Sequence, residues 1–125
     1  MHRSRLVAAL IDVPAERYES TAAFWSAALG AAPLEGTEDP DYVELGEVTP
    51  GFQLMIQRVG ADPRVHLDVE TDDVEAEVAR LEALGARRVN QEGSWWVLRD
   101  PAGLLFCVVR VQCPEAFSAH ATTWP

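Results

Sequence analysis

The stretch from Arg64 to Glu70 holds the residues best suited to chemistry, because apolar and polar side chains alternate strictly along it. This alternation predicts a half-buried strand, with Val65, Leu67 and Val69 on one face and His66, Asp68 and Glu70 on the other. An imidazole beside a carboxylate can hold a metal ion or transfer a proton. His66 can equally form only a hydrogen bond to Asp68 or to a neighbouring strand. Both interpretations stay open at this point.

Cys107 and Glu44 are two further candidates outside this strand. Cys107 lies in an apolar run, where a buried thiol behaves as a small hydrophobic group. A reactive thiolate there would need a cationic neighbour, which His66 could supply. Glu44 shares a strand face with Tyr42 and suits either a general base or a solvated edge strand.

Trp95 and Trp96 are adjacent in one predicted strand, so their rings must lie on opposite faces of the sheet. One ring is expected to pack toward the helices. The other suits a planar or cationic ligand, although core packing or a subunit interface would explain it equally well. The sequence contains no glycine-rich phosphate-binding loop and no serine-histidine-acid arrangement.

The elements that position these residues follow from a repeat. The tetrapeptide Ala-Leu-Gly-Ala occurs at residues 28–31 and 83–86 and predicts two copies of one supersecondary unit. A helix over about 19–29 should bury Tyr18, Ala22, Trp25 and Leu29, and a helix after Asp73 should bury Val74, Val78, Leu81 and Leu84. Gly30 and Gly85 should end them. Strands are predicted at 5–12, 42–45, 52–59, 64–70, 87–89, 94–99 and 104–111, with a polar loop through Pro40.

The composition excludes several classes of protein. The chain has 125 residues and a formal net charge of −10, which opposes nucleic-acid binding. No apolar run approaches the roughly 18 residues of a membrane span. With two cysteines and no signal-peptide pattern after Met1, we expect a cytoplasmic protein without disulfides. Residues 112–125 show no periodicity and are predicted to form a loosely held C-terminal tail.

Two motifs carry a family resemblance: residues 66–73 (HLDVETDD) and the turn and strand at 100–109 (DPAGLLFCVV). With the first strand and helix, they make the chain resemble the vicinal oxygen chelate superfamily of glyoxalases, bleomycin-resistance proteins and dihydroxybiphenyl dioxygenases. The resemblance implies an α+β fold. Two tandem β-α-β-β-β modules, about 5–59 and 64–111 within a single domain 1–111, should form a curved, open half-barrel sheet with the helices on its convex side.

The resemblance also implies a ligand cleft on the concave side of that sheet. Strand alternation then directs to the cleft His66, Asp68, Gln53, Met55, Gln57, Cys107 and one of Trp95 and Trp96. Metal-dependent relatives hold a divalent ion with four His, Glu or Gln side chains. The corresponding positions here are Ala8, either Gln57 or Met55, His66 and Cys107. We therefore expect no metal; His66, Gln57 and Cys107 would hold one if it were bound, with Zn, Ni, Mn and Mg as the candidates.

Two functional hypotheses follow from the resemblance. The first is a small-molecule-binding protein that sequesters a ligand, as bleomycin-resistance proteins do. The second is a metal-dependent lyase or isomerase resembling lactoylglutathione lyase, with Glu44 and Asp68 as weak catalytic candidates. Both predict a homodimer.

Overall fold

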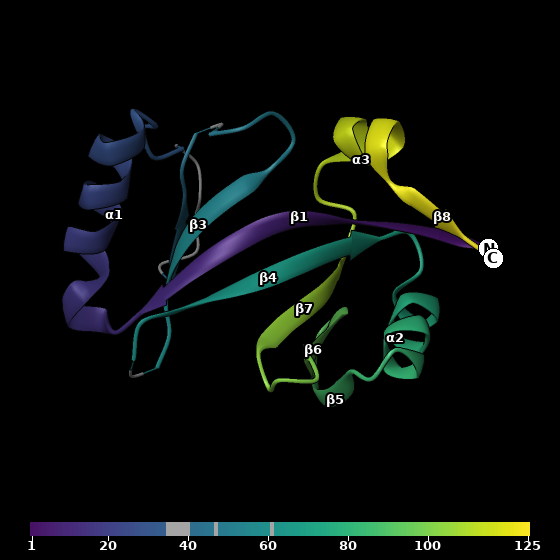
Figure 1. Cartoon of the computed structure of the whole chain (residues 1–125). Coiled ribbons are helices and arrows are strands. Elements are labelled where there is room, and N and C mark those ends of the chain that lie inside the picture. Colours follow the sequence, from purple (N-terminus) through teal and green to yellow (C-terminus); the bar gives the residue numbers. More distant parts are fainter. Residues whose placement is uncertain (35–40, 47, 61) are drawn as a thin grey trace. The chain divides into compact units, whose positions relative to one another are not determined.

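The computed structural model describes residues 1–34, 41–46, 48–60 and 62–125 (Figure 1). The predicted polar loop through Pro40 lies largely outside these residues. Within the described part the chain forms three helices and eight strands of an α+β fold. None of the described helices is long and apolar enough to cross a membrane.

The chain divides into two compact units, and the division falls inside two strands. One unit is Ala8–His66; the other, called here the C-terminal unit, comprises Met1–Val7 and Leu67–Pro125. Strands β1 (His2–Val13) and β4 (Arg64–Thr71) each contribute residues to both units.

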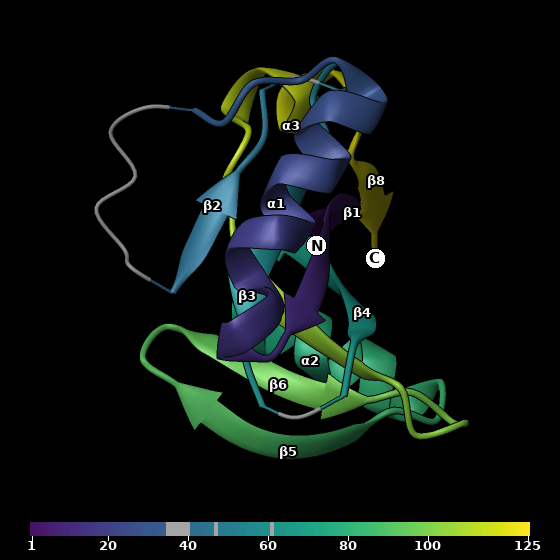
Figure 2. The same ribbon diagram turned by 90° about the vertical axis from the view of Figure 1, so that its left-hand side faces the viewer.

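The Ala8–His66 unit packs helix α1 (Ala15–Leu29) on strands β1 and β3 (Gln53–Arg58). Strand β3 runs parallel to β1, and β2 (Tyr42–Glu44) runs antiparallel to β3. Figures 1 and 2 show α1 lying alongside these strands. The core consists of Val13, Ala31, Leu45 and Ile56, with Tyr18, Ala22 and Trp25 of α1 packed against it.

Helix α1 matches its predicted stripe except at its C-terminal end. Gly30 ends the helix with a left-handed φ of 65°, as expected for a C-cap glycine. Leu29 is 41% exposed, so its predicted burial was wrong. The helix also begins at Ala15, earlier than predicted, because the extended Pro14 provides its N-cap.

The C-terminal unit has strand order β4-β7-β6-β5, with β7 (Leu105–Arg110) parallel to β4 and the other neighbours antiparallel. Strands β5 (Arg87–Glu92) and β6 (Trp95–Arg99) form its outer hairpin, which Figure 2 shows clearly. Helix α2 (Val74–Ala83) begins at Asp73, whose side chain accepts a hydrogen bond from the N–H of Ala76.

Helix α2 covers a core of Val78, Leu98 and Val108, with Val74 and Leu81 packed against it as predicted. Leu84 is 68% exposed, so its predicted burial was wrong. The error repeats the one at Leu29: each leucine directly precedes a glycine of positive φ at the end of its helix, and Leu84 is already the C-cap residue of α2.

The C-terminal residues are folded, which corrects the prediction of a loosely held tail. Helix α3 (Pro114–His120) leads into strand β8 (Thr122–Trp124), which pairs antiparallel with β1 at His2–Ser4. The indole N–H of Trp124 donates to the Ser4 hydroxyl at 2.9 Å, and the Arg80 guanidinium lies 3.8 Å from the centre of the Trp124 ring. Figure 1 shows β8 beside the start of β1.

Candidate functional site

Strand β3 presents a polar face opposite helix α1. Leu54 and Ile56 pack in the core under α1, which confirms the predicted alternation. The intervening residues therefore lie on the other face, where register pairs Gln53 with Ala8, Met55 with Leu10 and Gln57 with Asp12. Glu44 joins this face as the cross-strand partner of Met55.

His66 is held by a carboxylate that the sequence analysis missed. Its Nδ1 atom lies 2.6 Å from Oδ2 of Asp12, which is only 2% exposed. With Nδ1–H donating to Asp12, the imidazole is fixed in the tautomer whose Nε2 carries the lone pair. Arg64 lies at the edge of this pair, with Nε 4.0 Å from the same carboxylate oxygen. The available signal was a single acid directly after the apolar run at residues 6–11, on the same strand face as Ala8.

A second carboxylate, that of Asp68, lies on the same face of β4 as His66, two residues further along the strand. Asp68 is the cross-strand partner of Cys107 on β7. Ligand atoms of Asp68 and Cys107 lie within 4.8 Å of each other. Gln57 pairs with Asp12 in the register of β3 and β1.

The donor atom of His66 suits one class of metal. Imidazole suits Zn²⁺, whereas Mg²⁺ and Mn²⁺ prefer oxygen ligands. Oδ1 of Asp12, the carboxylate that contacts His66, is buried and has no hydrogen-bond partner among the described residues.

Glu44 has a modified acidity. Burial raises the pKa of its carboxyl above the ordinary value, because the charged form loses solvation. Gln53 donates a hydrogen bond from Nε2 to Glu44 Oε1 at 3.0 Å. A carboxyl of raised pKa beside an amide is suited to exchange a proton or to bind a polar ligand group.

The two tryptophan rings lie on opposite faces of the sheet, as their adjacency in one strand predicts. Trp96 packs with the core under α2, and the Arg88 guanidinium lies 4.7 Å from its ring centre. Trp95 is 41% exposed. Its side chain lies on the same face of β6 as that of Val97, and Val97 is the cross-strand partner of Cys107. Trp95 is therefore the ring on the face that carries Asp68 and Cys107.

Two buried acids in the C-terminal unit serve the fold. Glu70 accepts hydrogen bonds from Arg5 Nε at 2.6 Å and from the backbone N–H groups of Gln112 and Cys113. Glu77 is fully buried and contacts His2 and Arg80. Both carboxylates are satisfied within the unit, so their burial is explained by structure.

Residues 8–109 match the family described as the glyoxalase-like domain. The chain belongs to this family. No curated protein is significantly similar to the sequence.

Solved structures share this glyoxalase-like fold at low sequence identity. The Mn(II)-bound glyoxalase from Novosphingobium aromaticivorans has a TM-score of 0.61 and 19% identity over 86% of this chain, which spans only 39% of that protein. Methylmalonyl-CoA epimerase from Mycobacterium tuberculosis has a TM-score of 0.54 and 20% identity, covering 89% of this chain and 91% of its own. A glyoxalase/bleomycin resistance protein/dioxygenase superfamily member from Vibrio splendidus 12B01 has a TM-score of 0.50 and 17% identity, covering 86% and 100%.

This glyoxalase-like chain departs from the ligand pattern that the resemblance implied. The position on its first strand is Ala8, a fully buried residue without a donor atom. Asp12, further along the same face of that strand, instead contacts His66. Asp12 therefore contacts His66 and does not take the place of the donor that Ala8 lacks.

Proposed function

We propose that this glyoxalase-like protein binds a small organic molecule on the polar face of its Ala8–His66 unit. The oriented His66, held by the buried Asp12 at 2.6 Å, is the observation that carries the proposal. A buried carboxylate that contacts one ring nitrogen fixes the orientation of the imidazole, which makes His66 a candidate contact for a polar ligand group. Gln53, Met55, Gln57 and Glu44 would supply further contacts on that face.

A second candidate function uses a divalent ion, as the resemblance implies, with His66 as its candidate ligand in the Ala8–His66 unit. Among the candidate ions, imidazole suits Zn²⁺ and Ni²⁺. A bound ion of this kind acts as a Lewis acid that polarises a substrate oxygen, which would support lyase or isomerase chemistry. Asp12 would orient His66, and Glu44 would hold or release a proton at its carboxyl.

Metal analysis of the purified chain, combined with native mass spectrometry, separates the two functions. Stoichiometric zinc that is lost in His66→Ala and retained in His120→Ala would support the second function. A co-purified organic molecule without metal, lost in His66→Ala, would support the first. Zinc binding that raises the unfolding temperature should follow mass action, and Mg²⁺ should give no comparable shift.

We also propose that the protein is a homodimer, as the resemblance suggests, and that it is cytoplasmic, as expected from its two cysteines and the absence of a signal-peptide pattern. Light scattering coupled to size-exclusion chromatography tests the oligomeric state directly, and a mass of one chain would contradict it.

A further inference from the structure

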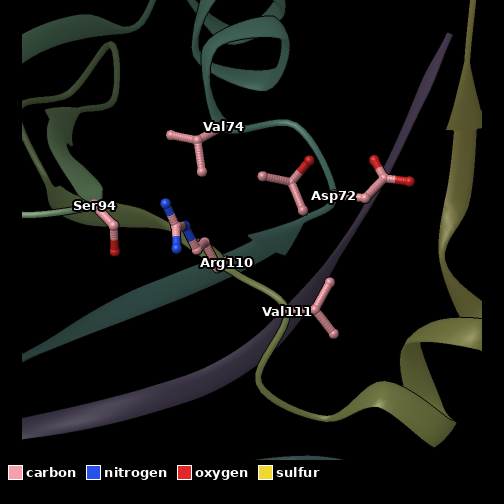
Figure 3. Close-up of a pocket in the computed structure, with 6 residues that line it drawn as sticks. Asp72, Val74, Ser94, Arg110 and Val111 are labelled. Carbon is pink, nitrogen blue, oxygen red and sulfur yellow. The ribbon is translucent and has the colours of Figure 1, made fainter.

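The C-terminal unit contains a cavity on the face of its sheet opposite to Asp68 and Cys107. The cavity measures about 460 Å³ and is lined by Thr71, Asp72, Val74, Ser94, Arg110 and Val111 (Figure 3). Arg110 on β7 is the cross-strand partner of Thr71. Its side chain lies on the same face of β7 as that of Val108. Because Val108 packs under α2, Arg110 lies on the same face of the sheet as this helix, and its side chain is exposed.

Arg110 is a guanidinium without an acceptor in the described part of the chain. Figure 3 shows its side chain between Ser94 and Val74. The Asp72 carboxylate points away toward β1, where it accepts the backbone N–H of Arg3 at 2.8 Å.

The other acids near this cavity are also engaged. Asp73 accepts the N–H of Ala76, and Glu75 pairs with Arg88 at 3.2 Å. Among the described residues, no contact thus neutralises the positive charge of Arg110, although the protein carries a net charge of −10.

We propose that this cavity binds a small aliphatic carboxylate. The guanidinium of Arg110 offers the planar pair of donors that matches a carboxylate, and the Ser94 hydroxyl can donate a further hydrogen bond. Val74 and Val111 provide apolar walls for a short alkyl chain. The cavity volume lies within the range of small-molecule sites. The site is separate from that of the proposed function and does not depend on it.

Titration of the ¹⁵N-labelled full chain with butyrate, in the presence of a metal chelator, tests the proposal by NMR. We expect saturable shifts of the Val74, Ser94 and Val111 amide signals. Butyramide, which has the same shape without the charge, should give none. Arg110→Gln should weaken butyrate binding about tenfold or more, because hydrogen bonds to charged groups are among the stronger ones. The butyrate affinity of Arg110→Lys should lie between those of the wild-type protein and Arg110→Gln, since lysine keeps the positive charge but lacks the planar pair of donors.

Matched variants test whether butyrate binding depends on Arg110 in particular. Arg87→Gln removes an exposed arginine of the same unit that does not line the cavity, and it should leave butyrate affinity unchanged. His66→Ala should also leave it unchanged. Absence of saturable shifts, equal weakening by Arg87→Gln, or tighter binding of inorganic phosphate than of butyrate would each overturn the assignment.

Discussion

His66 Nδ1 and Asp12 Oδ2 lie 2.6 Å apart, and the carboxylate of this pair is buried. The pair joins the beginning of β4 to the end of the apolar strand β1. It fixes the imidazole that the sequence marked as its best functional candidate. Its geometry leads to the first prediction.

Asp12→Asn should release the His66 ring from a single tautomer, because an amide can donate as well as accept. In the wild-type protein, ¹⁵N NMR of the imidazole should show a protonated Nδ1, and in the variant a mixture. Zinc affinity, measured by competition with a chromophoric chelator, should fall about 10- to 100-fold. Asp62→Asn, at an exposed site, is the matched control. Unchanged His66 signals in Asp12→Asn would contradict the positioning role.

Cys107→Ser should abolish thiolate coordination if Cys107 is a metal ligand. Cobalt(II) added to the wild-type chain should produce a thiolate-to-metal absorption band, because cobalt substitutes for zinc in mixed nitrogen and sulfur sites. Cys113→Ser, which changes the other cysteine, should retain the band. A band that survives Cys107→Ser would place the metal elsewhere.

Trp96→Ala should destabilise the protein more than Trp95→Ala, although the two residues are neighbours. Removing the Trp96 ring leaves a cavity beside Val108 and Leu98, with an expected loss of about 3 kcal/mol in the free energy of unfolding. Trp95 is substantially exposed, so its loss should be below about 1 kcal/mol. Urea unfolding of both variants gives the comparison, and equal losses would refute the assignment of faces.

Glu77→Gln should reduce the free energy of unfolding at neutral pH by about 3 kcal/mol, since it leaves Arg80 and His2 without their buried charged partner. Burial alone would raise the pKa of Glu77, but hydrogen bonds from Arg80, Ser4 and His2 outweigh it and hold the pKa below the ordinary value of 4.5.

The stabilisation from Glu77 is therefore fully present above about pH 4.5 and is lost as the pH falls through the lower pKa of the folded state. Urea unfolding over a pH series should show this acid-side decline in the wild-type protein and a flatter profile in Glu77→Gln. Glu115→Gln, at an exposed site in α3, should follow the wild-type profile.

Much of the fold could be predicted because local chemistry specifies it. The alternation of residues 64–70 predicted β4, Asp73 predicted the start of α2, and Gly30 predicted the end of α1. Burial at the helix ends could not be predicted in this way, because Leu29 and Leu84 fit the helical period and yet both are exposed in the folded chain.

The sequence by itself determined the family, the α+β class and the polar strand face with His66, because periodicity and turn residues act within a few positions of the chain. Only the tertiary structure decided that Asp12 holds His66 and that Asp68 lies beside Cys107. Only the tertiary structure showed, too, that the C-terminal residues form β8 and pair with β1. These contacts join residues up to 122 positions apart, and strand register, which no local pattern encodes, sets each of them.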